Sequence, residues 1–289
     1  MMAVQPRVVD AGRGWEWWVE GARLFRARAG MWVALIIVYA IVMVVIGYVP
    51  YVGDLGQSLL TPVFMGGLMI ACRAVDRGEP LRLSHLFEGF QGMHFVQLLI
   101  IGALNVAIVL GLKLVTGAGL LGTIAIDDIS MTDPMAGLAG SALAMGATAL
   151  LMLLLVLIVA TAIMMLNWFA PALVALRGVP AVPAMKLSFV ASVRNWVAFL
   201  VYGIIVAAAT VVLGIGGIVL AVVFGAGGIV AAQSITQGIA AFVGFFVVMA
   251  IAAILLVAVV GPITVGSVYA GFKDTLDDDD ATVTDPAYR

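Results

Sequence analysis

Residues 195–272 read NWVAFLVYGIIVAAATVVLGIGGIVLAVVFGAGGIVAAQSITQGIAAFVGFFVVMAIAAILLVAVVGPITVGSVYAGF, a run without Asp, Glu, Lys or Arg. An α-helix rises about 1.5 Å per residue, so about 20 apolar residues cross the hydrocarbon core of a bilayer. The run is therefore long enough for two membrane spans with a turn between them. It decides the fold class, because a soluble domain carries charge at about a quarter of its positions.

The whole chain shares this composition. Of its 289 residues, 64% are hydrophobic and 10% are charged, which excludes a water-soluble globule and a disordered chain. The single cysteine, Cys72, excludes a disulfide within the chain. We therefore predict an all-α, polytopic membrane protein. Its six transmembrane helices are expected at residues 30–49, 55–73, 93–115, 140–170, 196–224 and 238–269.

The distribution of positive charge predicts the orientation of these spans. Lys and Arg stay on the cytoplasmic side of a bacterial membrane, because translocating them is costly. The six predicted spans place 13 of the 14 Lys and Arg residues on one side. The exception, Lys113, lies at the far end of the third span, where a long side chain reaches the opposite headgroup layer. We therefore expect both termini in the cytoplasm (N-in/C-in).

Recurring spacings indicate three related helical hairpins. An aromatic or histidine residue opens each odd-numbered span, seven residues after a phenylalanine. The even-numbered spans share an exit, in which a proline precedes a glycine and then a basic residue. These exits are Pro62, Gly66 and Arg73; Pro262, Gly266 and Lys273; and a shorter version from Pro171 to Arg177. Coincidence among apolar helices is the alternative explanation of these matches.

The repeat leads to a domain prediction. We expect a single six-helix membrane domain over residues 1–275, of which residues 1–29 form a cytoplasmic lead-in. Its pseudo-repeats are expected at about residues 15–75, 81–177 and 181–273. Residues 276–289, which include four consecutive aspartates, are expected to form a disordered acidic tail.

Juxtamembrane amphipathic helices are expected before the odd-numbered spans, and the first is the clearest. Trp15, Trp18, Ala22 and Phe25 form one stripe of a helix, and charged residues fill another face. Such a helix lies well in the headgroup layer. Trp17 and Leu24 lie off the stripe, so the separation of the two faces is imperfect.

Three phrases of the chain carry a family resemblance. They are GWEWWVEGARLFRARAGMW at 14–32, LLTPVFMGGLMIACRAVDRGEPLRLSHLFEGF at 59–90 and WFAPALVALRGVPAVPAMKLSF at 168–189. The chain resembles a family of uncharacterised six-span inner-membrane proteins of proteobacteria. More loosely, it is similar to the membrane domain of some glycerophosphodiester phosphodiesterases. The resemblance implies an inner-membrane location and this helix plan. It implies no activity, because the family is uncharacterised. The soluble domain of the phosphodiesterases has no counterpart in these 289 residues, so the looser similarity implies no hydrolase chemistry.

The cations at the predicted cytoplasmic ends of the spans are candidates for lipid headgroup binding. Each cation near an anionic membrane surface gains about 1 kcal/mol. The alternative is that any bacterial membrane protein shows such a basic rim. The candidates are Arg73, Arg77, Arg82, Arg177, Lys186 and Arg194.

Prolines inside the predicted spans are the second group of candidates. Proline frees the carbonyl group four residues earlier, and broken helices can form ion or substrate sites at membrane depth. The alternatives are a simple kink and, for the amides, a contact between helices. The prolines are Pro62, Pro171 and Pro262, and the neighbouring polar residues are Ser58, Asn167 and Asn105.

The sequence thus favours an integral inner-membrane protein without evident catalysis, which organises lipid or a membrane protein partner. A transporter or channel for a small neutral or amphipathic solute is the alternative. An intramembrane enzyme would need a nucleophile or an acid–base pair at depth, and the residues present supply neither. We expect no cofactor, no metal and no nucleic acid partner. Membrane lipids, a protein partner or further copies of the chain are the expected partners.

Overall fold

The computed structural model describes residues 5–50, 53–125, 134–220 and 234–277. These residues form helices and no strands. The helices are α1 (Arg13–Ala27), α2 (Ala29–Gly47), α3 (Gly53–Asp76), the 3₁₀ helix η1 (Leu83–Phe90), α4 (Gly92–Ala125), α5 (Pro134–Asn167), α6 (Ala170–Arg177), α7 (Ala181–Arg194), α8 (Trp196–Leu220) and α10 (Ile235–Leu276).

Six stretches of helix in this part of the chain are long and apolar enough to cross a membrane. This finding confirms the predicted all-α, polytopic fold class. The stretches are Ala29–Gly47, Gly53–Asp76, Gly92–Ala118, Gly146–Arg177, Trp196–Gly217 and Leu256–Leu276. The orientation of the spans stays a prediction.

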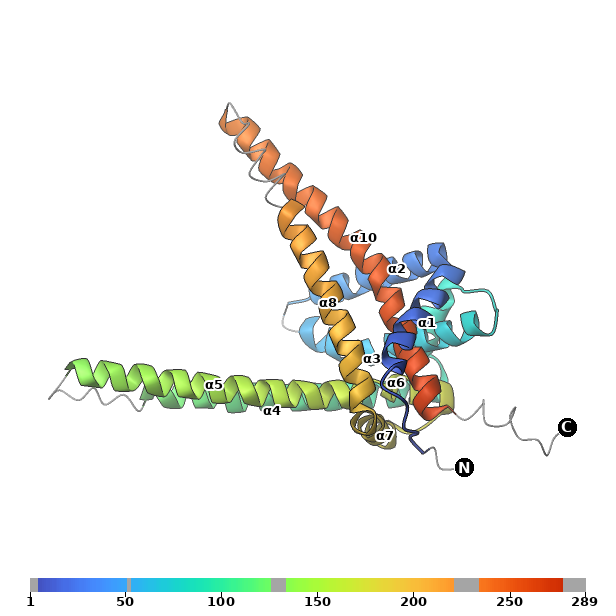
Figure 1. The fold of residues 1–289 in the computed structure, drawn as a ribbon, viewed down its shortest axis with the longest axis horizontal. Coiled ribbons are helices and arrows are strands. Elements are labelled where there is room, and N and C mark those ends of the chain that lie inside the picture. The colour runs from blue at the N-terminus through green and yellow to red at the C-terminus, as the bar shows by residue number, and fades with distance from the viewer. Residues whose placement is uncertain (1–4, 51–52, 126–133, 221–233, 278–289) are drawn as a thin grey trace.

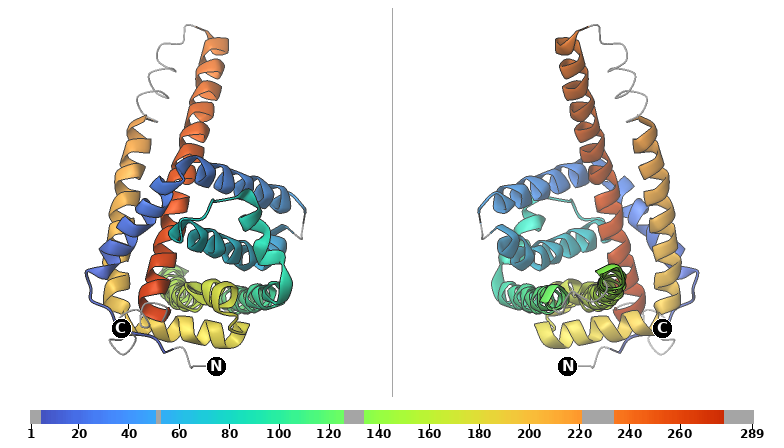
Figure 2. Two further views of the ribbon diagram at one scale, coloured as in Figure 1. Left: turned by 90° about the vertical axis from the view of Figure 1, so that its right-hand side faces the viewer. Right: turned by 90° about the vertical axis from the view of Figure 1, so that its left-hand side faces the viewer.

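The long helices diverge from one region of the molecule, which we call the base (Figures 1 and 2). α4 and α5 run side by side away from the base, and α8 and α10 extend from it at a steep angle to them. The segment before α1 meets the end of α10 at this base, where the amide of Arg7 donates to the carbonyl oxygen of Thr275 at 2.9 Å. The polar ends of the helices therefore gather in one region of the molecule.

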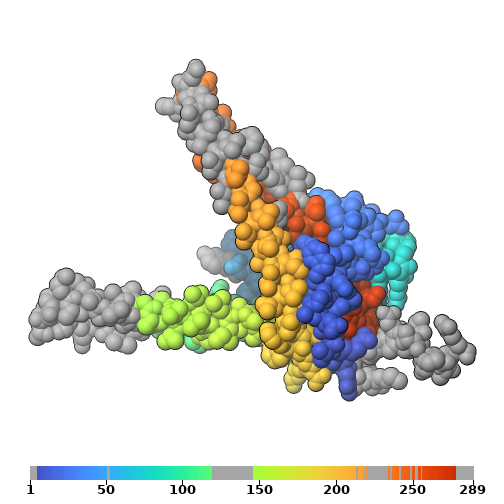
Figure 3. All heavy atoms as spheres, in the orientation of Figure 1, coloured from blue at the N-terminus to red at the C-terminus, as the bar shows by residue number. Residues whose placement is uncertain are grey.

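At the base, α1 packs against the end of α10 through glycine. A Cβ atom on Gly21 would lie 2.3 Å from the carbonyl oxygen of Ile263, and one on Gly266 would lie 2.8 Å from the Cα of Gly21. Such close approach of two backbones requires residues without side chains. Figure 3 shows α1, in blue, lying along the neighbouring α8 on one face of the molecule.

The buried face of α1 differs from the aromatic stripe expected from the sequence. Gly14, Trp17, Gly21 and Leu24 face the protein, while Trp15 is 54% exposed. Trp17 and Leu24, which lie off the expected stripe, are therefore the large residues that anchor the helix. The indole of Trp17 packs on two rings of α8 and donates to Asp274 of α10 at 2.6 Å. The helix thus has two apolar faces, one of which packs on the protein.

The other juxtamembrane segments also pack on even-numbered spans. η1 packs on α3, where a Cβ on Gly89 would lie 2.0 Å from the carbonyl oxygen of Val63. α7 packs on both α5 and α6. Each segment thus contacts the span before it, and α1 contacts the last span. The three-hairpin repeat and the domain limits stay predictions.

The three prolines occupy two different kinds of position. Pro62 and Pro262 lie inside α3 and α10. Pro171 lies in the first turn of α6, where its missing N–H would have no helical partner in any case. The span expected at residues 140–170 is interrupted after Asn167, where a new helix begins, and its apolar stretch continues through α6 to Arg177.

A serine from α7 satisfies the backbone at this break. The hydroxyl of Ser188 accepts from the amide of Phe169 at 2.9 Å and donates to the carbonyl oxygen of Met165 at 2.7 Å. Ser188 itself is fully buried. Unpaired backbone N–H and C=O groups cost free energy away from water. By pairing with one of each, the Ser188 side chain lowers the cost of the break.

Candidate functional site: a polar pocket where three helices end

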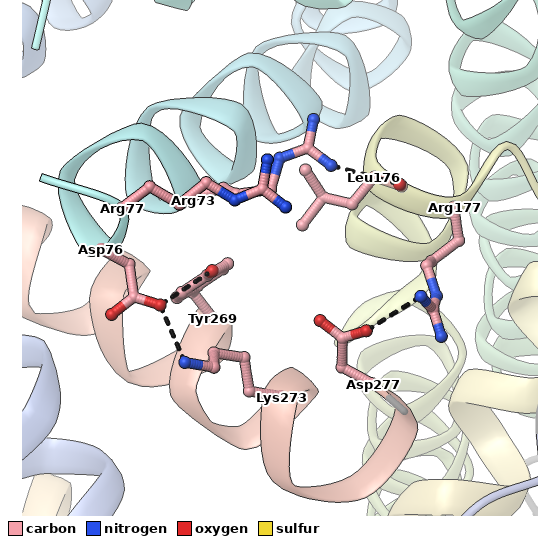
Figure 4. Close-up of a pocket in the computed structure, with 8 residues that line it drawn as sticks. All are labelled: Arg73, Asp76, Arg77, Leu176, Arg177, Tyr269, Lys273 and Asp277. Carbon is pink, nitrogen blue, oxygen red and sulfur yellow. Dashed lines mark hydrogen bonds and ion pairs between the residues drawn. The ribbon is translucent and has the colours of Figure 1, made fainter. Parts of the chain in front are cut away.

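The ends of α3, α6 and α10 converge on a polar pocket of about 170 Å³ (Figure 4). Each of these helices carries a basic residue in its last turn, where the negative end of the helix dipole favours a cation. The pocket is lined by Arg73, Asp76, Arg77, Leu176, Arg177, Tyr269, Lys273 and Asp277.

Two arginines of α3 form one wall of the pocket. Arg73 and Arg77 lie one helical turn apart at the end of α3, and both side chains extend into the pocket (Figure 4). Arg73 donates to the carbonyl oxygen of Leu176, at the end of α6, over 3.3 Å. Within the described residues, neither arginine forms an ion pair with a carboxylate. Two like charges therefore lie together without a neutralising acidic side chain.

Asp76, at the end of the same helix, also lines the pocket and joins three helices. Its carboxylate accepts from Lys273 Nζ at 2.8 Å and from the hydroxyl of Tyr269 at 3.3 Å. Its other oxygen accepts from Arg23 of α1 at 2.9 Å. The Asp76 side chain is only 15% exposed, and its charge is compensated by these two cations.

A second ion pair closes the pocket. Arg177 Nη1 lies 3.1 Å from Asp277 Oδ1, and both side chains are largely buried. The sequence assigned Asp277 to a disordered tail beginning at residue 276. The structure instead places Leu276 in α10, where it is buried, and pairs Asp277 with α6. The rest of the predicted tail, residues 278–289, lies outside the described residues.

Comparison with known proteins places the chain in a family. It is 31% identical to the "probable inner membrane protein" of Burkholderia thailandensis over 205 residues, which cover 68% of this chain and 73% of the relative. The chain belongs to this inner-membrane protein family. No protein-family model and no solved structure matches it. With its six apolar helices, it is a multi-pass protein of the bacterial inner membrane. The looser similarity to the phosphodiesterase membrane domain stays a prediction.

The pocket of this inner-membrane protein contains three of the six cations proposed from the sequence. Arg73, Arg77 and Arg177 line it. Arg82 and Lys186 are exposed outside it, and Arg194 donates to the carbonyl oxygen of Pro6 at 3.3 Å. The predicted rim is thus divided into a pocket and a set of separate surface charges.

Sequence reasoning missed the other polar residues of the pocket. Lys273 was used for the topology and for the repeat but not for the site, and Asp76, Tyr269 and Asp277 were given no role there. One signal was present, because Arg73 and Lys273 occupy matching positions after Pro62 and Pro262. Equivalent ends of related helices can converge, which brings their basic residues together. A nearby acidic residue would then be expected to form an ion pair with one of them.

The candidates expected at membrane depth do not form one site. Asn105 of α4 and Asn167 at the end of α5 exchange two hydrogen bonds of 2.9 Å, one from each amide nitrogen. This is a contact between helices, of the kind that a buried amide makes in a membrane. Ser58 donates instead to the carbonyl oxygen of Asp54 in its own helix at 2.8 Å.

The segment before α1 is held at the base by side-chain hydrogen bonds. Asn195, between α7 and α8, accepts from the amide of Val9 and donates to the carbonyl oxygen of Arg7, each at 2.8 Å. Arg13 donates to Asp274 from Nε at 2.8 Å, and this hydrogen bond raises the pKa of Arg13. The guanidinium therefore stays charged and links α1 to α10 on the outer side of the pocket.

Proposed function

We propose that this inner-membrane protein is a non-catalytic protein that binds and organises anionic lipids through the pocket between α3, α6 and α10. The observation that carries the proposal is the pair of adjacent guanidinium groups of Arg73 and Arg77, which have no carboxylate partner in the described residues. Guanidinium groups bind phosphate oxygens through paired hydrogen bonds, so a phosphate-bearing headgroup is the chemical complement of this wall.

A purely structural role accounts for part of the arrangement. Arg73 supports the end of α6 through its hydrogen bond to Leu176, and a cation at a helix C-terminus gains from the dipole. Neither effect requires a second guanidinium beside the first, and the two positive charges repel each other. Arg77 is exposed and has no such backbone contact among the described hydrogen bonds. An incoming anion would remove this repulsion.

The orientation of the protein is part of the proposal. The segment before α1, the end of α10 and the pocket with its four cations share the base of the molecule, which we assign to the cytoplasmic leaflet. That leaflet of a bacterial inner membrane would supply the anionic headgroups, and positive charge is normally retained there. Labelling of single cysteines placed near Arg77 and Arg194 should reach both sites from the cytoplasm. Labelling of the two sites from opposite sides would refute this orientation.

Charge reversal at the pocket tests the lipid-binding function. The double variant R73E/R77E, extracted in mild detergent, should retain about tenfold less anionic phospholipid than the natural sequence, because two attractive charges become repulsive. The control R82E/K186E changes the net charge equally but leaves the pocket intact. Equal lipid retention by R73E/R77E and the natural sequence, or equal loss in both variants, would contradict a role for this pocket.

A transport function is the second candidate, because one observation favours it. A groove of about 910 Å³ lies between α8 and α10, and hydroxyls of Thr210 and Thr264 are the polar side-chain groups along its apolar lining. Such a groove suits a small amphipathic solute. Solute flux through proteoliposomes, compared with empty liposomes, tests this function. Flux that persists in R73E/R77E would favour the groove over the pocket.

A further inference from the structure

We infer that the pocket selects a phosphate monoester over a phosphate diester. This inference rests on the proposed function and makes it specific, because it concerns the charge and the oxygen count of the bound headgroup. Among the described residues, the lining contributes four cations and two carboxylates, an excess of two positive charges. A phosphate monoester carries a charge of about −1.5 to −2 at pH 7, whereas a diester carries one negative charge.

The excess charge is located at one wall of the pocket. Asp76 is paired with Lys273, and Asp277 is paired with Arg177. Arg23, the third donor to Asp76, is matched by Glu20 of its own helix. These ion pairs account for both carboxylates among the described residues that line the pocket. The two charges left over are those of Arg73 and Arg77, which are neighbours on one helix.

The hydrogen-bonding geometry leads to the same preference. Each guanidinium presents a fork of N–H donors, and two adjacent forks can occupy three or four acceptor positions. A monoester offers three terminal oxygens, whereas a diester offers two and carries an ester chain on each remaining oxygen. Arg73 donates one N–H to the carbonyl oxygen of Leu176, and its other N–H groups make no hydrogen bond among the described contacts. Three terminal oxygens therefore suit this wall better than two.

The size and the exposure of the pocket are compatible with such a group. A volume of about 170 Å³ exceeds the space that one ordered water needs by about tenfold, which leaves room for a phosphate group. Arg77 is exposed at its mouth, so a ligand can enter without displacing a helix. A monoester at this place is either the headgroup of a membrane lipid or a soluble phosphate ester, and the two share the recognised chemistry.

Thermal unfolding of the full chain in detergent, with added ligands, tests the inference. The lipid probes are phosphatidic acid, a monoester, and phosphatidylglycerol, a diester with the same acyl chains. At a fixed concentration, a ligand that binds only the folded state raises the unfolding temperature more when it binds more tightly, with a logarithmic dependence on its affinity. We expect phosphatidic acid to bind about tenfold more tightly at pH 7.5. Glycerol 3-phosphate, without acyl chains, distinguishes the soluble source from the lipid source.

The pH of the assay supplies an independent readout. A monoester loses its second proton near pH 6, so the preference for phosphatidic acid should largely disappear at pH 5. Phosphatidylglycerol has no such step, and its binding at the same two pH values corrects for titration of the protein's own groups. A preference that is unchanged at pH 5 would overturn the charge argument.

Variants complete the test. R77Q alters an exposed side chain, is expected to fold, and should abolish the preference, whereas K186Q should keep it. Equal binding of both lipids by the natural sequence would refute the monoester inference and leave the proposed lipid function intact. Binding of neither lipid, with R77Q and the natural sequence behaving alike, would refute both. Binding of glycerol 3-phosphate as tight as that of phosphatidic acid would assign the site to a soluble ester.

Discussion

The third helix and the fifth helix differ in what surrounds them. In α3, 61% of its apolar stretch is buried inside the protein, whereas in α5 none of it is. The buried helix has the lower mean hydropathy, 1.6 against 3.0 for the exposed one. A helix surrounded by lipid needs only apolar side chains, whereas a helix surrounded by protein needs small residues and matched polar groups. The glycines differ in the same way. Several at the base lie against the backbone of another helix, whereas most of those in the lipid-facing helices have space around them.

The strongest test of this contrast is a pair of glycine substitutions. G21A should destabilise the protein by roughly 3 kcal/mol, because the new Cβ would lie against backbone atoms of α10 that have little freedom to move. G111A in α4 is the control, since no atom lies within 4 Å of its Cβ position. Thermal unfolding in detergent measures both. Equal effects would show that α1 is not closely packed on α10.

A second pair of substitutions tests the break between α5 and α6. S188A should cost about 2 kcal/mol, because it leaves the amide of Phe169 and the carbonyl of Met165 without their partner. S192A, one turn later on α7, removes a buried hydroxyl that has no hydrogen-bond partner in the described residues. It should change stability by less than about 0.5 kcal/mol. A larger loss from S192A than from S188A in denaturant unfolding would contradict the bridging role.

The smallest effect is expected for the paired amides of α4 and α5. In a double-mutant cycle with N105A and N167A, the coupling energy should be about 0.6 kcal/mol, the average for side-chain hydrogen bonds within a membrane protein. Unfolding free energies of the two single variants and the double variant give this value. A coupling energy near zero would show that the two amides act independently.

The lipid-facing helices could be predicted well from the sequence. Runs without charge located all six spans, and for the first span the expected residues 30–49 closely match α2 (Ala29–Gly47). The prediction worked because the bilayer imposes a simple rule of length and polarity on each segment separately. The span before Pro171 was less accurate, since a proline in the first turn of a new helix resembles a proline in the middle of a long one.

The base and the pocket could be predicted only in part. The cations at the ends of the spans were identified, but which of them meet depends on how α3, α6 and α10 cross. Those crossings depend on contacts such as Gly66 of α3 with Ala175 of α6, between residues far apart in the sequence. Asp76 illustrates the difficulty, because its three partners come from α1 and the distant end of α10. A single sequence does not reveal such pairs.

The contact between α1 and α10 has a consequence for biosynthesis. Gly21 and Gly266 are separated by about 245 residues, so the first helix emerges from the ribosome long before its docking surface exists. At about 5–20 residues per second, translation of the intervening chain lasts on the order of 10 to 50 seconds. During this interval the tryptophan side chains of the nascent helix need another apolar environment, and the membrane surface is the nearest one. Docking of the first helix on the last is therefore among the final steps of assembly.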